Sequence, residues 1–189
     1  MRGIRKKNFS RMKESSASKE EWYALRTANE SRLAEMLAGK GVEVYCPTRK
    51  SRPSGGGKPR ELALIPHVIF IRTRRSIALR LEAKGRKESD PMPMFWIYRY
   101  KKGDRIQGIP LYQMRLLQLL SADDSTRCEI YRKADFERGE RVRIIGGTFK
   151  GLEGNVQRVK KNKHVVVRIE GVCAVMLPFI HPDLLEHIS

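Results

Sequence analysis

The spacing of apolar residues changes repeatedly along the N-terminal part of the chain. Residues 22–27 (WYALRT) alternate as in a strand, and the apolar residues between 33 and 37 recur at helical spacing. Thr27 and Glu30 have the spacing of a capping box, which predicts the start of that helix. Further strands are expected over 42–48, 62–72 and 94–100, and further helices over 76–85 and 109–120.

This order of strands and helices predicts an α+β domain over residues 20–121, with one antiparallel sheet flanked by helices. Pro66 lies inside the expected strand 62–72 and therefore predicts an edge position or a bulge. Residues 49–61 (RKSRPSGGGKPRE) are basic and rich in Pro and Gly, so they predict an exposed loop or hairpin tip.

The two ends of the chain have other patterns. Residues 122–135 show no sustained period and predict a linker, whereas residues 136–189 contain short alternating runs joined by glycines, typical of a small β-barrel. Residues 1–19 are basic and Ser-rich with almost no apolar content, so we expect a disordered arm there. That arm is either a solubilising tail or a segment that adds affinity for nucleic acid.

The glycines of residues 136–159 (FERGERVRIIGGTFKGLEGNVQRV) stand between two alternating runs. A phosphate-binding P-loop is excluded, because no Lys-Ser or Lys-Thr follows the later glycines and no helix follows them. A hairpin is predicted instead. Gly146 and Gly147 are expected to supply positive φ for a tight turn, and Gly151 and Gly154 to let the backbone bend and approach its neighbour.

The charge of the chain points to a polyanionic partner. Its 39 Lys and Arg residues outnumber its 21 Asp and Glu residues, for a formal net charge of +18. Nucleic acid is the first expectation, an anionic membrane surface the second and an acidic protein the third. No apolar run approaches the roughly 18 residues of a membrane span, and the basic N-terminus has no signal-peptide core, so a cytoplasmic protein is expected.

Catalytic and metal-binding patterns are not found in the sequence. Cys46, Cys128 and Cys173 form no CxxC pair and are expected to be reduced thiols in the protein interior. The four histidines have neither metal-ligand spacing nor a neighbouring Ser or Cys in a nucleophile motif. We therefore expect a protein that is not an enzyme and that holds no metal and no cofactor.

Basic residues cluster in two places. One cluster lies in the polar loop and contains Arg49, Lys50, Arg52, Lys58 and Arg60. The other is the candidate nucleic-acid-binding track, with solvated surface charge as the alternative, and few acidic residues interrupt it. It consists of Arg72, Arg74, Arg75, Arg80, Lys84, Arg86 and Lys87.

Two groups of apolar residues are candidates for partner contact. Leu64, Ile65 and Val68 surround Pro66 and predict an exposed protein-binding patch, with ordinary core packing as an equal alternative. The aromatic residues between 96 and 100 are compatible with base stacking, but their alternation with apolar neighbours favours sheet packing.

Taken together, these segments resemble the NusG-type transcription elongation factors over residues 21–188. Residues 139–159 (GERVRIIGGTFKGLEGNVQRV) are similar to the KOW motif, and residues 22–27, 30–48 and 64–72 are similar to strands and the first helix of the NusG N-terminal domain. Leu64, Ile65, His67 and Val68 stand where that family has aromatic residues and glycine. Residues 108–120 and 165–188 resemble most the UpxY-type antiterminators of polysaccharide operons.

The resemblance implies a monomeric transcription elongation or antitermination factor that binds the clamp helices of RNA polymerase. It assigns the polymerase contact to Tyr23, Leu64, Ile65, Pro66 and Val68. The basic track is the implied contact with DNA or nascent RNA at the transcription bubble. The KOW hairpin is the implied contact with RNA, the ribosome or another factor, and it consists of Gly146, Gly147, Phe149, Lys150, Gly151 and Gly154.

A ribosome-associated or RNA-binding KOW protein without a polymerase role is the alternative from another class. The basic charge of the sequence would suit such a protein equally well. The N-terminal domain distinguishes the two hypotheses, because a ribosomal KOW protein has no need of residues 22–72 in this pattern.

Overall fold

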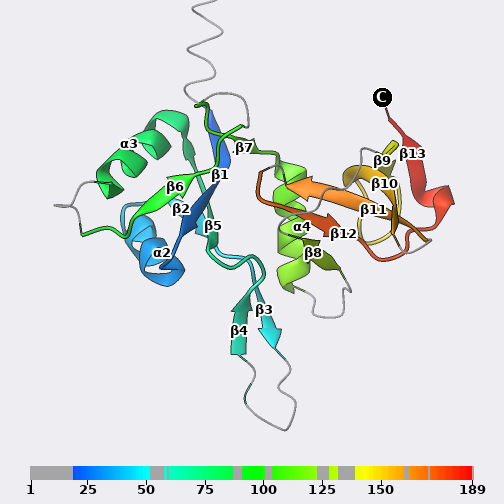
Figure 1. The fold of residues 1–189 in the computed structure, drawn as a ribbon, viewed down its shortest axis with the longest axis horizontal. Coiled ribbons are helices and arrows are strands. Elements are labelled where there is room, and N and C mark those ends of the chain that lie inside the picture. The colour runs from blue at the N-terminus through cyan, green and yellow to red at the C-terminus, as the bar shows by residue number, and fades with distance from the viewer. Residues whose placement is uncertain are drawn as a thin grey trace, which may run out of the picture. The chain divides into compact units, whose positions relative to one another are not determined.

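A computed structural model describes residues 19–51, 58, 60–86, 91–100, 104–122, 128–131, 139–159, 162–169 and 171–188. The basic arm expected over 1–19 lies, apart from Lys19, outside the described residues. Within the described residues the chain forms two compact units, one from the residues up to Tyr45 and His67–Gly108, the other from Cys46–Pro66 and the residues after Gly108. Figure 1 shows the elements of both.

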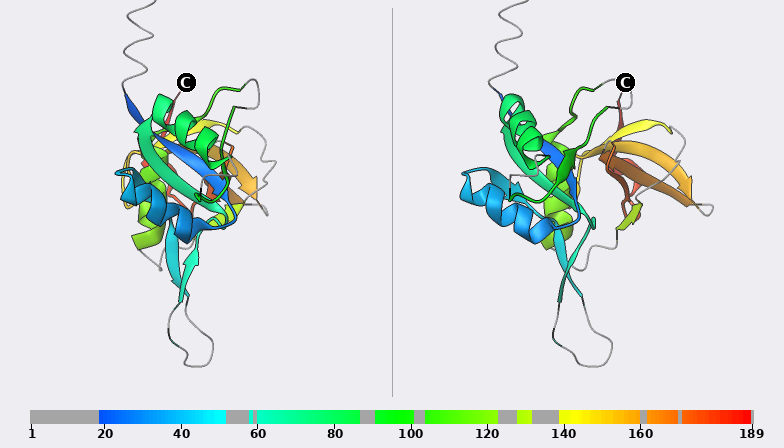
Figure 2. Two further views of the ribbon diagram at one scale, coloured as in Figure 1. Left: turned by 90° about the vertical axis from the view of Figure 1, so that its left-hand side faces the viewer. Right: turned by 60° about the vertical axis from the view of Figure 1, so that its left-hand side comes forward.

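The first unit is an antiparallel sheet with two helices, of the α+β class that the sequence predicted, but the helix expected over 109–120 lies in the second unit. The strand order is β2-β5-β1-β6, and the short β7 also pairs with β1. Figure 2 shows both helices in front of one face of this sheet. The strands are β1 (Glu20–Thr27), β2 (Glu43–Tyr45), β5 (Val68–Arg74), β6 (Phe95–Ile97) and β7 (Gly108–Ile109), and the helices are α2 (Glu30–Gly39) and α3 (Arg75–Gly85).

The register between strands decides which side chains share a face, because successive residues of a strand point to opposite faces. Tyr23 pairs with Ile71, and Leu25 pairs with both Ile69 and Ile97. These residues lie on the helix face, where the neighbouring Phe95 ring packs against Gly85 of α3. Both faces of β1 are covered along its middle, since the four residues from 22 to 25 are all buried.

The strand expected over 62–72 is interrupted, and the prediction that Pro66 lies at a sheet edge or bulge within it is wrong. The strand β4 (Arg60–Ala63) ends before Pro66, and β5 begins after it as an inner strand. The corner between them contains His67, which has a φ of 66°. This is the left-handed region that favours glycine, and glycine is what the NusG-type pattern has at this position.

Glu30 holds this corner rather than closing a capping box. The N-cap of α2 is Asn29, whose side chain accepts a hydrogen bond from the Arg32 N–H, so the predicted box with Thr27 does not form. Glu30 Oε1 instead accepts a 2.6 Å hydrogen bond from the backbone N–H of His67. The Thr27 hydroxyl donates to the Met94 carbonyl, which ties the end of β1 to the start of β6.

A buried carboxylate attaches the edge strand β6 to α3. Glu82 of α3 is only 3% exposed, and its Oε1 accepts a 2.8 Å hydrogen bond from the Ile97 N–H. Arg99 donates to both carboxylate oxygens of Glu82, at 3.1 and 2.6 Å, and also to the Ile97 carbonyl. Arg86, one turn further along α3, lies 3.2 Å from the same carboxylate. A short strand at the sheet edge is thereby fixed from the helix side.

The second unit contains an all-β region and one further helix. Its strands form an antiparallel sheet in the order β13-β9-β10-β11-β12-β8, and β3 (Thr48–Ser51) and β4 form a separate two-stranded sheet. The helix expected over 109–120 is α4, which begins at Leu111, directly after Pro110. The remaining elements are α4 (Leu111–Ala122), β8 (Glu129–Tyr131), β9 (Arg141–Ile144), β10 (Glu153–Val159), β11 (Asn162–Ile169), β12 (Cys173–Met176), the 3₁₀ turn η1 (Pro182–Leu184) and β13 (Leu185–His187).

Two expectations about the C-terminal part change. The segment expected to be a linker contributes β8, which pairs with β12 at the edge of the six-stranded sheet. The sequence did not predict β8, because a strand of only three paired residues is too short to show an alternating pattern. Among the described residues, β13 and β8 are the two edges of this sheet and do not pair with each other. These strands therefore form an open sheet, whereas a small β-barrel was expected.

Replacing Glu82 tests the attachment of β6. Glu82→Ala leaves the half-buried Arg99 guanidinium and the Ile97 N–H without their acceptor, and we expect a loss of about 3 kcal/mol in the free energy of unfolding. Chemical denaturation followed by circular dichroism measures it. Glu35→Ala, which removes an exposed carboxylate from α2, is the matched control and should change stability by less than about 0.5 kcal/mol. Equal losses of unfolding free energy for both variants would show that Glu82 does not stabilise the attachment of β6.

The same carboxylate predicts a pH dependence. Burial acts to raise the pKa of Glu82, but the hydrogen bonds from Arg99 and the Ile97 N–H, with the charges of Arg99 and Arg86, outweigh it and lower that pKa. A lowered folded-state pKa contributes stability above the ordinary glutamate pKa, and that stability is lost as the pH falls through the folded-state value. The acid-side decline in stability should therefore be shallower for Glu82→Ala than for the unaltered chain.

Candidate interfaces with a partner and with nucleic acid

The residues expected to form a polymerase-binding patch do not share one exposed surface. Tyr23, Ile65 and Val68 are buried, Leu64 is half-buried and Pro66 is exposed. Tyr23 lies on the helix face of the sheet, whereas Val68 pairs with Arg26 and lies on the opposite face. The core-packing alternative therefore describes Tyr23, Ile65 and Val68.

Tyr23 is tied into the helix-face core by its hydroxyl as well as its ring. The hydroxyl donates a 3.0 Å hydrogen bond to Glu21 Oε2. Burial raises the pKa of Tyr23, and the hydrogen bond to Glu21 and the charge of that carboxylate raise it further. The phenol thus stays protonated and structural.

The opposite face of the sheet carries an aromatic cluster that the sequence did not single out. Trp22 packs edge-on against Tyr45 with ring centroids 6.5 Å apart, and Tyr45 lies 6.5 Å from Phe70. These residues come from β1, β2 and β5. A period-2 signal was present in residues 22–27, but both faces of that strand are apolar, so the pattern could not assign the cluster to a face.

Arg26 and Trp96 lie at one end of this face, and the exposed Met94 directly precedes β6. We call these three residues the β6 patch: Arg26, Met94 and Trp96. Trp96 is 47% exposed and pairs across the sheet with the exposed Arg26, while Met94 is 53% exposed. Phe95 and Ile97, on either side of Trp96, are buried on the helix face. Sheet packing was expected of the aromatic residues Trp96, Tyr98 and Tyr100, but Trp96 faces outward, Tyr100 is 42% exposed and only Tyr98 is half-buried.

The basic track is divided between two surfaces. Arg72 and Arg74 follow Val68 and Phe70 at every second position of β5, so they share the face opposite to the helices. The exposed Arg80 and Lys84 are four residues apart on α3, where neighbouring turns place them side by side.

Ion pairing further distinguishes the members of the track. Arg72 lies 3.3 Å from Glu43 and 4.0 Å from Glu20, and Arg86 is bound to Glu82. Arg75 is half-buried. Lys87 falls outside the described residues. A continuous run in the sequence is therefore not a continuous surface, because the strand-to-helix junction at Arg74 turns its two halves apart.

The KOW-like hairpin is formed by β9 and β10, and its glycines act partly as predicted. Gly147 has a φ of 74°, as expected, but Gly151 rather than Gly146 is the second glycine with positive φ, at 86°. An added Cβ at Gly146 would lie 2.8 Å from Leu184, and one at Gly154 would lie 2.8 Å from Val166 O. Gly146 thus serves close packing, and the predicted close approach at Gly154 is confirmed.

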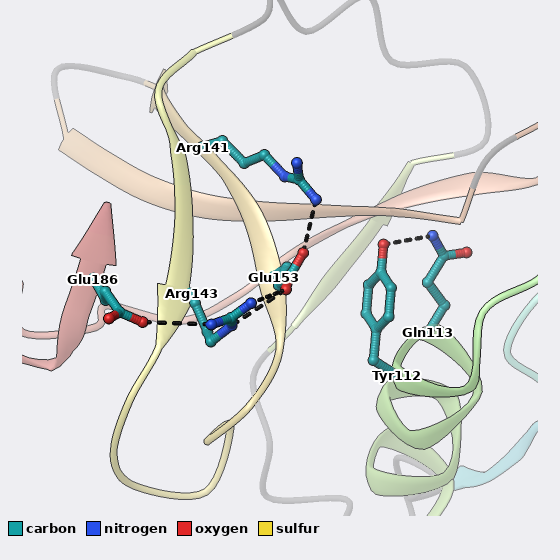
Figure 3. A network of polar contacts seen from close by, with 6 residues as sticks. All are labelled: Tyr112, Gln113, Arg141, Arg143, Glu153 and Glu186. Carbon is teal, nitrogen blue, oxygen red and sulfur yellow. Dashed lines mark hydrogen bonds and ion pairs between the residues drawn. The ribbon is translucent and has the colours of Figure 1, made fainter. Parts of the chain in front are cut away.

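The side chains of this hairpin differ in accessibility. Phe149 is buried at 6% exposure, whereas Lys150 beside it is exposed. Glu153 of β10 binds Arg141 at 2.8 Å and Arg143 at 2.7 Å, and Arg143 also lies 3.6 Å from Glu186 of β13 (Figure 3). The hydrogen bond from Arg143 is the main cause of the lowered pKa of Glu153. This network links three neighbouring strands on the outside of the sheet.

The remaining candidates for chemistry are structural. Cys173 is buried, and Cys46 and Cys128 are half-buried, all as free thiols. Burial raises the pKa of Cys128 to about 11 and that of Cys173 to about 12. Within the described residues no group of His, Cys, Asp and Glu is arranged to hold a metal ion. No helix in the described part of the chain is long and apolar enough to cross a membrane.

Comparisons with known proteins agree with the sequence pattern in one segment. Residues 138–170 match the KOW motif. These residues include β10 and β11 together with β9, so the motif coincides with the centre of the six-stranded sheet. A search of curated proteins finds no match.

One solved structure is similar along most of the chain. It is a structure of Thermotoga maritima NusG that concerns domain interaction in that protein, and the two chains have 20% sequence identity and a TM-score of 0.42. The similarity covers 92% of this chain and 99% of the Thermotoga chain.

Gly154→Ala tests the close approach of β10 to β11. The added methyl group would meet the Val166 backbone carbonyl, which cannot rotate away, so we expect a loss of roughly 1–3 kcal/mol in the free energy of unfolding. Thermal and urea unfolding measure this. Gly39→Ala at the end of α2 is the control, since nothing lies within 4 Å of its added Cβ, and it should be neutral or slightly stabilising. Equal stability of the two variants would contradict the role given to Gly154.

Proposed function

We propose that this protein is a NusG-type transcription elongation or antitermination factor that binds RNA polymerase and suppresses pausing or termination. The observation that carries the proposal is the presence, in one chain and in this order, of an antiparallel α+β unit and a sheet that contains the KOW motif. Action at a specific set of operons, such as capsular polysaccharide loci, follows from the resemblance of residues 108–120 and 165–188 to UpxY-type proteins. The protein acts as a cytoplasmic monomer without a cofactor.

Such a factor needs differential affinity rather than chemistry. A ligand shifts a conformational equilibrium only by as much as it prefers one state over the other. A preference of ~1–3 kcal/mol for the elongating over the paused polymerase changes pausing severalfold to about a hundredfold. Two modules in one chain also raise the effective concentration for the second contact. The surplus of basic residues supports a further contact with nucleic acid at the transcription bubble.

For the polymerase contact we assign the β6 patch in place of the buried residues of the corner. Trp, Met and Arg are enriched in the cores of protein interfaces, and Trp and Arg dominate their binding energy. Met94 and Trp96 are exposed large apolar side chains, and Arg26 lies directly opposite Trp96. Pro66 remains accessible and is kept as a contributor, whereas Tyr23, Ile65 and Val68 are too deeply buried to touch a partner.

The first test is retention of the full chain on nuclease-treated core RNA polymerase at increasing salt. We expect binding to persist at high salt, because an apolar contact is not screened. Trp96→Ala should weaken it by roughly thirtyfold, as removal of a hot-spot residue costs about 2 kcal/mol. Phe179→Ala is the matched control, an aromatic side chain that is 70% exposed in the second unit.

Three outcomes separate the hypotheses. Loss of retention with Trp96→Ala alone supports both the function and the patch. Equal retention of both variants on polymerase would support the proposed function but would contradict the β6 patch as the polymerase contact. Binding of the unaltered chain that vanishes as salt rises, with ribosomes or RNA bound instead, supports the alternative of a KOW protein without a polymerase role.

A further inference from the structure

The helix α3 presents a solvent-exposed face that contains no acidic residue. Figure 2 shows α3 in front of the sheet, and its residues Leu81 and Gly85 are buried on the side toward the strands. Glu82, the only acidic residue of α3, is also buried and is bound to Arg99. The exposed residues lie on the other side of the helix, and we call them the outer face of α3: Ser76, Leu79, Arg80, Ala83 and Lys84.

The two positive charges of the outer face are not neutralised within the described part of the chain, where neither Arg80 nor Lys84 forms an ion pair. Arg72 of β5, in contrast, lies 3.3 Å from Glu43. Arg80 and Lys84 are four residues apart, so they are neighbours on successive turns of the helix. Like charges at this spacing repel each other and destabilise a helix slightly. An anion bound between them would remove that repulsion.

We propose that the outer face of α3 binds the phosphate backbone of duplex DNA. This contact deepens the proposed function, on which the choice of DNA as the partner rests, because an elongating polymerase holds duplex DNA on both sides of the transcription bubble. Arg80 and Lys84 supply the charges that attract phosphates, and the exposed Ser76 hydroxyl can donate a hydrogen bond to a phosphate oxygen. Only the helix half of the basic track then binds nucleic acid, and the half on β5 does not.

The spacing along α3 suits a row of phosphates. Residues four apart in a helix are separated by about 6 Å along its axis, because each residue adds about 1.5 Å. The phosphates of one DNA strand follow each other at about 3.4 Å along the duplex axis. Arg80 and Lys84 can therefore reach different phosphates of one strand at the same time. Ala83 lies beside them, and its small side chain lets the helix come close to the backbone.

Other polyanionic partners fit the outer face less well. A helix that lies on a membrane buries a broad apolar face in the lipid, but Leu79, at 37% exposure, is the one large apolar side chain on this face. The same lack of apolar side chains disfavours an acidic protein, since the cores of protein interfaces are apolar. Single strands are held largely by stacking on aromatic rings, and α3 contains no aromatic residue.

The test measures binding of the full chain, without polymerase, to a short fluorescent DNA duplex at several salt concentrations. Arg80→Gln and Lys84→Gln should each weaken binding roughly fivefold and reduce the slope of log affinity against log salt by about one. Two duplexes of unrelated sequence should show the same losses, because phosphates carry no sequence information. Arg80→Gln should not lower the unfolding midpoint, since it removes a like charge beside Lys84.

Two variants that remove the same charge elsewhere in the first unit are the controls. Arg72→Gln changes a side chain of the basic track that already binds Glu43. Arg32→Gln changes an exposed side chain of α2, where the exposed Glu35 follows three residues later. Both variants should leave the affinity for the duplex and the salt slope nearly unchanged.

Three results would overturn the proposal. Equal losses for all four variants would mean that net charge alone drives binding. Tighter binding of an RNA duplex or a single strand of the same length, with the same dependence on Lys84, would assign the outer face to another ligand. A loss confined to one DNA sequence would indicate base readout in place of a phosphate contact. Retention on polymerase at high salt is measured separately, so a chain that fails there contradicts the proposed function, while the salt slopes still decide whether α3 binds the duplex.

Discussion

The buried carboxylate of Glu82 is the interaction on which the accessible surface of the first unit depends. The edge strand β6 pairs with β1 over only three residues, and a strand so short is weakly held by its own ladder. Glu82 adds a charge-assisted anchor by accepting from the Ile97 N–H and from Arg99 at once. With Ile97 fixed toward the helices, alternation turns Trp96 outward beside Arg26. A residue inside the core thereby decides which aromatic ring is exposed.

The corner between β4 and β5 is the second constraint. His67 adopts a left-handed conformation that costs most residues about 1 kcal/mol or more, and Glu30 stabilises it by accepting from its backbone N–H. The corner ends one strand and starts another, which releases β3–β4 from the main sheet as an independent ribbon. The same turn buries Ile65 and Val68, so the apolar residues around Pro66 serve the fold more than a contact surface.

Charged residues are paired differently in two parts of the second unit. In the KOW region, Arg141 and Arg143 are bound to Glu153, so a basic strand is largely neutralised by its neighbours. In the β3–β4 ribbon, Lys50 pairs across the strands with Glu61, whereas Arg49 pairs with Leu62. The formal charge of +18 is therefore distributed unevenly, and the register of short strands decides which basic residues have an acidic neighbour.

Local patterns determined the elements: the sequence alone predicted the α+β class, a helix with apolar residues at helical spacing between 33 and 37, a helix over 109–120 and the close approach at Gly154. Period and turn chemistry act over a few residues, so they can be read from the chain. Tertiary structure decided that Tyr23 and Val68 face apart, that Trp96 is exposed and that β8 joins the second sheet. Alternation shows which residues share a face, but only pairing with distant strands and helices decides which face is covered.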